Sequence, residues 1–185
     1  MVNFYLTFLA VLLAGIGARD QALVAALTLA RGRRVAVIVL ALVMACLTAA
    51  FAVWAAQVIA PLLAPRARSF FAAMALGLAG LESLVLVPRR QPREPTLSLG
   101  ALVVVLAFLQ AVDAARFLIV AMAVAMHSAF SVGLAGAIGG CAIVLAGWMA
   151  PEWVTKPWMR IVRRAVGLLM LAVGVVLGLR ILDLV

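Results

Sequence analysis

Residues 4–30 read FYLTFLAVLLAGIGARDQALVAALTLA, and this stretch indicates the class of fold. It is long enough to cross the hydrocarbon core of a bilayer, because a spanning helix needs about 20 mostly apolar residues. Its only charged side chains are Arg19 and Asp20, which are adjacent and opposite in sign. The stretch therefore predicts a transmembrane helix that carries a pair of charges inside the membrane.

Further apolar runs follow along the chain, and they cover about residues 35–60, 69–87, 98–126, 130–150 and 165–184. A segment ahead of the last run, residues 151–164, reads PEWVTKPWMRIVRR. It is amphipathic, and its tryptophans and basic residues are typical of a membrane interface. We therefore expect an all-α integral membrane protein with six transmembrane helices.

The composition supports the same class. The 185 residues are 69% hydrophobic and 11% charged, with a mean hydropathy of +1.30. A soluble domain of this size could not cover so much apolar surface, so the lipid bilayer is the expected partner. We expect one membrane domain over residues 1–185, with no separate soluble domain. The net charge of +9 lies mostly in short loops, with no aromatic-basic platform, so we do not expect nucleic-acid binding.

The basic residues also predict the orientation. One set of alternate loops carries ten of them: Arg31, Arg33, Arg34, Arg89, Arg90, Arg93, Lys156, Arg160, Arg163 and Arg164. The other set carries only Arg66 and Arg68. Cytoplasmic loops are the ones enriched in Lys and Arg. We therefore expect basic loops in the cytoplasm and both termini outside, in the inner membrane of a bacterium.

The most polar linker, PRRQPREPT at residues 88–96, divides the apolar runs into two sets of three. Repeat 1 covers about residues 4–87 and repeat 2 about 97–184. An odd number of spans per half predicts that the halves insert with opposite orientation, as in many secondary transporters. Three matches at an offset of 96 residues support the repeat: Pro61 with Pro157, Arg68 with Arg164, and Met74 with Met170.

Charged residues in the first and fourth runs form the candidate site. They are Arg19, Asp20, Asp113 and Arg116. Each charge at the centre of a spanning helix costs about 2.5–3.5 kcal/mol on insertion scales, so such residues point to function. At the offset of 96, Asp20 corresponds to Arg116. We expect an Asp20–Arg116 ion pair, with Arg19 near Asp113. Two interpretations stay open, a polar centre that binds or relays an ion or small solute, and a structural lock between the halves.

Other polar residues in the apolar runs predict a polar path: Gln21, Gln110 and Glu82. Glu82 could instead reach the cytoplasmic interface or pair with Arg89, which follows it by two turns of helix. No nucleophile–base pair, Cys/His metal set or phosphate loop accompanies these residues. We therefore expect neither an enzyme nor a bound cofactor.

Glycines in the last two runs predict close helix packing, because small residues let helices approach each other in lipid. They are Gly133, Gly136, Gly139 and Gly140 in the fifth run, and Gly174 and Gly178 in the sixth.

The first and fourth runs contain the stretches AGIGARDQALVAALTLARGRR, residues 14–34, and FLQAVDAARFLIVAMA, residues 108–123. Both resemble the motif helices of the Golgi calcium/manganese–proton exchangers and their bacterial manganese-exporter relatives. Members of this family have two three-helix repeats, and each repeat opens with Glu-x-Gly-Asp-Lys/Arg-Ser/Thr. Gly17, Arg19 and Gln21 match the motif glycine, the basic position and a glutamine that commonly follows.

The four motif acids are absent. The glutamate positions fall at Gly15 and Ala111, and the aspartate positions at Ala18 and Ala114. Asp20 and Arg116 stand at the two Ser/Thr positions, and Asp113 stands at the second glycine position. The resemblance implies a divergent secondary transporter of the cation–proton exchanger type, with the Asp/Arg cluster in place of the metal-binding acids.

Manganese is one substrate that this resemblance allows, with Asp20, Asp113 and Glu82 as relocated ligands. The alternative is a degenerate subunit that does not transport and pairs with, or scaffolds, another membrane protein. The absence of the motif acids is the feature that favours this alternative.

Overall fold

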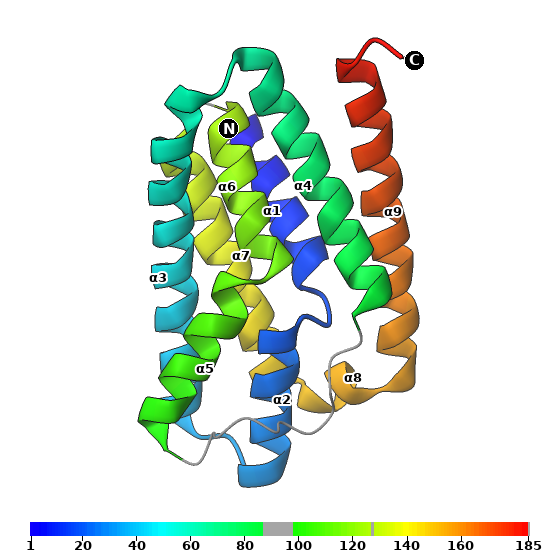
Figure 1. Ribbon diagram of the computed structural model, residues 1–185. Coiled ribbons are helices and arrows are strands. Elements are labelled where there is room, and N and C mark those ends of the chain that lie inside the picture. Colours follow the sequence, from blue (N-terminus) through cyan, green and yellow to red (C-terminus); the bar gives the residue numbers. More distant parts are fainter. Residues whose placement is uncertain (87–97, 127, 185) are drawn as a thin grey trace.

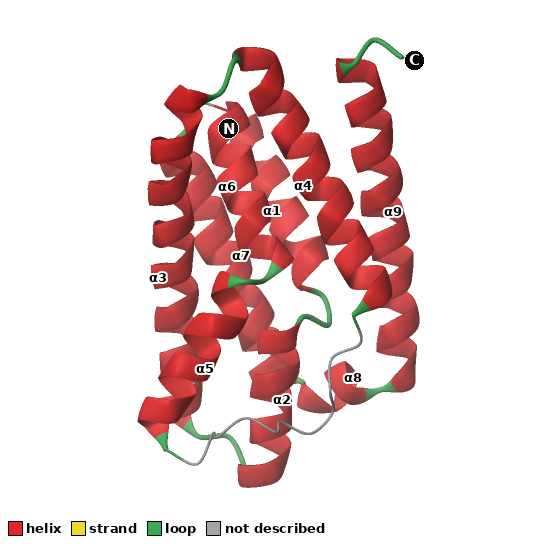
Figure 2. Ribbon diagram, in the orientation of Figure 1, coloured by secondary structure: helices red, strands yellow, loops and turns green. Residues whose placement is uncertain are grey.

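The computed structural model describes residues 1–86, 98–126 and 128–184, and these residues form helices and short loops with no strand (Figure 1 and Figure 2). The helices are α1 (Val2–Gly15), α2 (Arg19–Arg31), α3 (Val35–Ile59), the short 3-10 helix η1 (Ala60–Leu62), α4 (Pro65–Val85), α5 (Leu99–Ala111), α6 (Ala114–Met126), α7 (Ala129–Met149), α8 (Pro151–Thr155) and α9 (Pro157–Ile181). The all-helical class expected from the sequence is confirmed.

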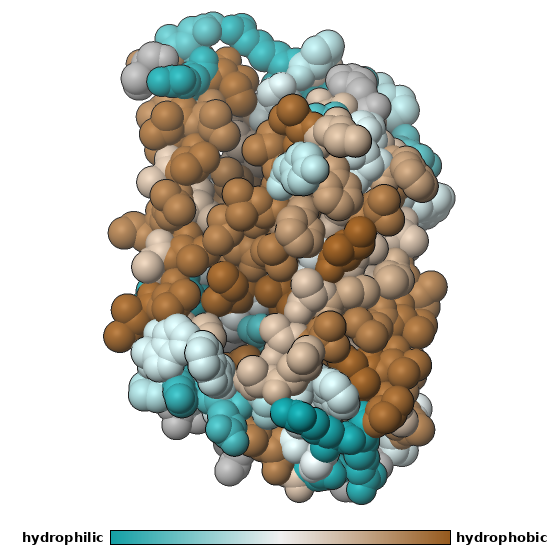
Figure 3. Space-filling view, turned by 180° about the vertical axis from the view of Figure 1, so that it is seen from behind, coloured by the Kyte–Doolittle hydropathy of each residue, from teal (hydrophilic) through white to brown (hydrophobic). Residues whose placement is uncertain are grey.

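Within the described residues, four segments are long and apolar enough to cross a membrane: Val35–Leu62, α4, α7 and α9. Two bent pairs, α1 with α2 and α5 with α6, pass the same test when each pair is taken together, which raises the number to six. On the face that Figure 3 shows, apolar side chains form a broad band across the middle, with hydrophilic residues toward both ends. The chain is a multi-pass integral membrane protein.

The first apolar run is not the single helix that we expected. It divides into α1 and α2, which meet at an angle of 56°. Gly17 has a φ of +67°, a left-handed conformation that suits glycine, and Ala18 is extended. These two residues interrupt the helix, so a glycine that we matched to a family motif is also the point where the backbone turns.

The fourth run is broken as well, into α5 and α6, with an angle of 52°. No glycine or proline lies at this break. Helix α5 ends at Ala111, and the backbone N–H of Ala115 donates to Oδ2 of Asp113 at 3.3 Å. A carboxylate at this position satisfies an N–H that has no partner within the helix, so Asp113 starts α6 as a capping residue.

The amphipathic segment also differs from our expectation. It is divided between the short helix α8 and the first two turns of α9, so the last helix begins at Pro157 rather than near residue 165. Helix α4 likewise begins at Pro65, ahead of the expected residue 69. Proline suits the first turn of a helix because it lacks the N–H that would be unpaired there. The linker 88–96 lies outside the described residues.

Two pairs of long helices pack antiparallel. In α3 and α7, Sγ of Cys46 lies 3.7 Å from Sγ of Cys141, and Val53 packs on Gly133. In α4 and α9, Gly80 meets Leu171 and Gly77 meets Gly174. Both termini lie at the same end of the bundle, and α9 stands at its edge beside α4 (Figure 1).

Candidate functional site

The two helix breaks lie against each other inside the bundle and bring polar side chains together. Asp20 lies in the first turn of α2, Gln110 at the end of α5, and Arg116 in the first turn of α6. Asp20 is 3% exposed and Arg116 is 4% exposed. Both charges are therefore held in the interior, as expected from the sequence.

Asp20 is bound on both carboxylate oxygens. Its Oδ1 accepts from the backbone N–H of Gln21 at 2.7 Å, and its Oδ2 accepts from Nε2 of Gln110 at 3.3 Å. The positive end of the α2 dipole further stabilises the negative charge. Asp20 thus joins the first break to the second through a neutral amide.

The direct Asp20–Arg116 ion pair that we predicted is not formed, because Gln110 and Thr48 stand between the two residues. The hydroxyl of Thr48, from α3, lies 3.3 Å from Oε1 of Gln110 and accepts from Nε of Arg116 at 3.0 Å. The network therefore runs from Asp20 through an amide and a hydroxyl to Arg116. Sequence equivalence at an offset of 96 could not reveal this, since Thr48 comes from a different helix.

The guanidinium of Arg116 depends on Gly140 of α7. A Cβ added to Gly140 would lie 3.1 Å from both Nη1 and Nη2 of Arg116, closer than nearly all real contacts. Among the described residues, Nη2 of Arg116 has no hydrogen-bond partner. Gly140, which we expected to serve helix packing, thus also provides the space in which a buried cation sits.

Asp113 is the third buried charge, at 7% exposure, and it interacts electrostatically with Asp20, Glu82 and Arg116. The predicted proximity of Arg19 to Asp113 stays a prediction, and the basic residue that contacts the first break is Arg163 of α9. The guanidinium of Arg163 interacts with Asp113, Glu82 and Asp20. Arg19 itself is only partly buried.

Arg163 binds the backbone of the first break. Its Nη1 donates to the carbonyl oxygen of Gly17 and, at 3.5 Å, to that of Ile16. These carbonyls follow the C-terminal end of α1, where the helix dipole favours a cation. We counted Arg163 among the cytoplasmic loop residues. The helical spacing of α9 could have identified it. Arg163 lies on the same buried face of α9 as Gly167, Met170 and Gly174.

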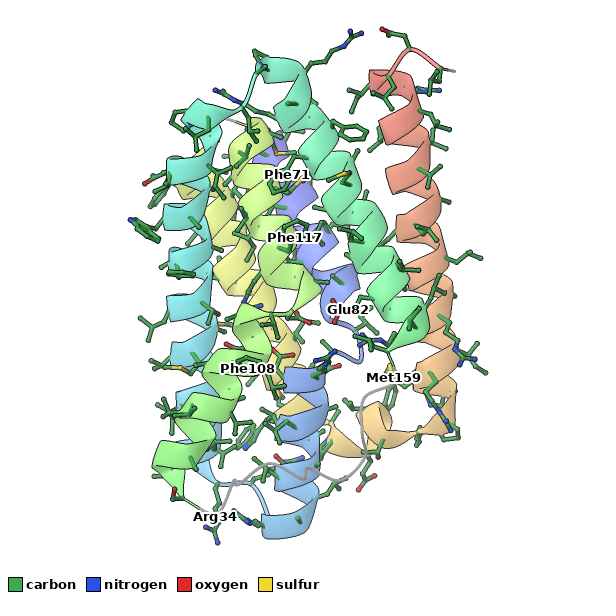
Figure 4. All side chains as sticks on the ribbon, viewed as in Figure 1. Arg34, Phe71, Glu82, Phe108, Phe117 and Met159 are labelled. Carbon is green, nitrogen blue, oxygen red and sulfur yellow. The ribbon has the colours of Figure 1, made fainter. Side chains whose placement is uncertain are left out.

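The expected polar path of Gln21, Gln110 and Glu82 remains a prediction. Both glutamine amides are engaged: Gln21 accepts from the N–H of Gly17 at 2.7 Å and donates to the carbonyl of Ile143 at 3.2 Å. Glu82 differs, because its carboxylate makes no hydrogen bond or ion pair with another described residue, although it interacts electrostatically with Asp113 and Arg163. Its predicted partner Arg89 lies outside them. Figure 4 shows the Glu82 side chain extending from α4 toward the interior, near the level of the second break.

A cavity of about 330 Å³ adjoins the second break, between α3 and α4. Its polar wall consists of Thr48, Glu82, Asp113 and Arg116. Its other walls are apolar side chains, and they include Phe51, Leu78, Phe117 and Val120. The network is therefore a wall of an open space rather than a sealed ion-pair core.

No group of three or more His, Cys, Asp and Glu side chains that could hold a metal ion forms within the part of the chain that the structure describes. Asp20, Asp113 and Glu82, which we considered as relocated metal ligands, are not gathered into such a group. Hard divalent cations need several oxygen ligands at once. Comparisons of the chain with protein-family models, curated proteins and solved structures find no match.

Proposed function

We propose that this protein is a secondary transporter of the cation–proton exchanger type, with six spans in two inverted three-helix repeats. The observation that carries the proposal is the meeting of two helix breaks at one buried network of charges, beside a cavity. Broken helices of this kind line the binding sites of many secondary transporters, since they offer helix ends and charged side chains at mid-membrane depth.

The positions of the breaks support the inverted repeat. Helix α1 ends at Gly15 and helix α5 ends at Ala111, which lies 96 residues further along the chain. The same offset relates Arg68 to Arg164 and Met74 to Met170. The antiparallel packing of α3 on α7, and of α4 on α9, is the relation that a pseudo-twofold axis in the membrane plane requires.

The resemblance to the calcium/manganese–proton exchangers supports the same class of protein. The motif glycine at Gly17 has the left-handed backbone that glycine adopts readily. At the second motif, Asp113 replaces the glycine, and among described non-glycine residues only Asp183 has a positive φ. The second break thus tolerates an aspartate, and on the proposed relationship this chain carries a carboxylate at a position where the family has glycine.

The polar wall of the cavity favours transport over a purely structural lock. A lock needs its charges paired in a dry core, whereas Asp113 and Glu82 border a space that can hold a solute. In an exchanger, a carboxylate in such a site carries either a proton or the transported cation, so loss of one carboxylate removes the coupling.

Proton movement in proteoliposomes tests this proposal. Purified protein is reconstituted with a trapped pH-sensitive dye, and Mn²⁺, Ca²⁺, K⁺ or an organic cation is added outside. At least one cation should drive proton movement. Asp113→Asn should slow it by roughly a hundredfold, as expected when a buried charged group is lost. Asp183→Asn is the matched control, because Asp183 is exposed and pairs with Arg66.

Proton movement equal to that of empty liposomes with every cation would contradict the proposal. Equal rates of proton movement for the wild type and Asp113→Asn would instead show that the second break takes no part in transport. In the first case the alternative, a non-transporting subunit or scaffold, becomes the better explanation, and co-purification of a stoichiometric membrane partner would support it.

A further inference from the structure

The cavity between α3 and α4 has a strongly divided surface, with charged groups at one wall and apolar side chains around the rest. We propose that it binds an amphipathic organic cation with a single positive charge. The charge would lie beside Glu82 and Asp113, and the apolar body against Phe51 and Phe117. This inference rests on the proposed function and specifies the substrate class of the same site.

The size of the cavity argues against a bare inorganic ion. At about 330 Å³ it falls within the range of pockets that hold small organic molecules, about 300–1,000 Å³. A water molecule in the liquid takes up only about 30 Å³. An inorganic cation would therefore leave most of this space to be filled, next to apolar walls that bind water poorly.

The charges that line the cavity sum to one negative charge, from Glu82, Asp113 and Arg116. The Arg116 guanidinium is directed toward Thr48 and Gly140. The Glu82 carboxylate, by contrast, makes no hydrogen bond or ion pair with another described residue, and Arg163, which interacts with it electrostatically, does not line the cavity. A ligand with one positive charge would neutralise the lining, whereas a divalent ion would leave an excess and would lack the third acidic ligand.

The apolar walls suit a flat or aromatic body. Phe117 is held by an edge-on contact with Phe71, with ring centroids 5.3 Å apart (Figure 4). This contact orients the Phe117 ring at the cavity. Phe51 lines the cavity from another helix, α3. Aromatic faces attract cations as well as apolar groups, so both parts of an amphipathic cation find a partner here.

The entrance faces sideways rather than toward water. Phe51 is 61% exposed and Val112 is 52% exposed, and both line the cavity. The second break lies between α3 and α4, about halfway along the bundle (Figure 1). A molecule that partitions into lipid can reach such an entrance from the bilayer, whereas a hydrated inorganic ion would have to lose its water first.

Binding of a styrylpyridinium dye, a flat fluorescent monovalent cation, to the full-length protein in detergent tests the site directly. Glu82→Gln should weaken binding by at least roughly tenfold, because an ionic contact is lost. Glu152→Gln, an exposed position on α8, is the matched control and should bind like the wild type. Ala55→Trp, which fills the cavity from α3, should abolish binding without removing a charge.

Competition completes the experiment. An uncharged stilbene of the same shape and Mn²⁺ should both fail to displace the dye, whereas a second aromatic ammonium compound should displace it. The inference is overturned if Ala55→Trp binds the dye as the wild type does, or if Mn²⁺ displaces it. Folding of each variant is checked by circular dichroism and gel filtration. If Glu82→Gln does not fold, Ala55→Trp still decides the outcome.

Transport of the same dye separates this inference from the proposed function. If the dye neither binds nor drives proton movement while another cation does, the substrate class is wrong and the transporter stands. If the dye binds and responds to both substitutions, but no cation moves protons, the binding site stands and the transporter is wrong.

Discussion

Arg163 is a buried cation that binds backbone rather than a carboxylate. Its guanidinium lies at the C-terminal end of α1, while Asp20 lies at the N-terminal end of α2. Each charge therefore matches the dipole of the helix end that it faces. The break in the first span is stabilised by this pairing of charge with helix end, and Gly17 supplies only the turn.

Replacing Arg163 by leucine should destabilise the protein, because the carbonyls of Ile16 and Gly17 lose a charged donor. Hydrogen bonds to charged groups contribute about 1.5–3 kcal/mol, so we expect a clear fall in the thermal midpoint in detergent. Arg164→Leu, at the exposed neighbouring position, should leave the midpoint nearly unchanged. Equal midpoints for the two variants would show that Arg163 does not hold the break.

At the scale of helices, the contact between α4 and α9 depends on close approach of their backbones. A Cβ added to Gly80 would lie 2.4 Å from the backbone N of Leu171 and 2.5 Å from the carbonyl oxygen of Gly167. Backbone atoms cannot move aside as a flexible side chain can. Helix α9 stands at the edge of the bundle, so its position depends chiefly on this contact (Figure 1).

Gly80→Ala should therefore push α4 and α9 apart and destabilise the protein by about 1–3 kcal/mol, the usual range for overpacking. Gly77→Ala is the control on the same helix, because its Cβ would meet only Leu171 Cδ1, at 3.9 Å. Thermal unfolding of the two variants in one detergent provides the measurement. Alanine favours a helix over glycine, so Gly77→Ala should be neutral or slightly stabilising. A Gly77→Ala variant as unstable as Gly80→Ala would mean that the backbone contact at Gly80 does not decide the effect.

The sequence predicted the long uninterrupted helices well and the broken ones poorly. Hydropathy alone predicted residues 35–60 as a helix, and α3 covers Val35–Ile59. It could not predict the break after Ala111, where no glycine or proline interrupts the apolar run. That break is stabilised by a cap from Asp113 and by the network through Thr48, and contacts of this kind form only when separate helices pack.

The same limit applied to the candidate site. The cost of burying charge identified Asp20, Asp113 and Arg116, and all three are buried. The sequence could not show which arginine would face which aspartate, because this depends on how the helices pack. Arg163, which the sequence assigned to a loop, interacts with Asp113, and Thr48 and Gln110 stand where a direct ion pair between Asp20 and Arg116 was expected.

At the scale of the whole molecule, basic residues gather at the end of the bundle opposite both termini. Arg33, Arg34 and Lys156 lie at that end, and Arg66 pairs with Asp183 at the other. The excess of positive charge sets the orientation of a membrane protein during insertion. It predicts that the end with both termini faces away from the cytoplasm.

Fusion reporters in a bacterial host check this orientation. Alkaline phosphatase fused after Val185 should be active, since it folds only outside the cytoplasm, and green fluorescent protein at the same point should be dark. Inserting either reporter after Gly32 should reverse both readings. Fluorescence at the C-terminal fusion would contradict the predicted orientation and, with it, the assignment of the basic loops.

The contact between Arg163 and Gly17 joins residues that are 146 positions apart in the chain. During synthesis, the opening span leaves the ribosome long before the arginine that completes it. Its carbonyls at the turn stay open to water or to the insertion machinery until α9 arrives. The first break is therefore completed only when α9 packs against it. Chains arrested before residue 163 should be the preferred substrates of membrane quality control.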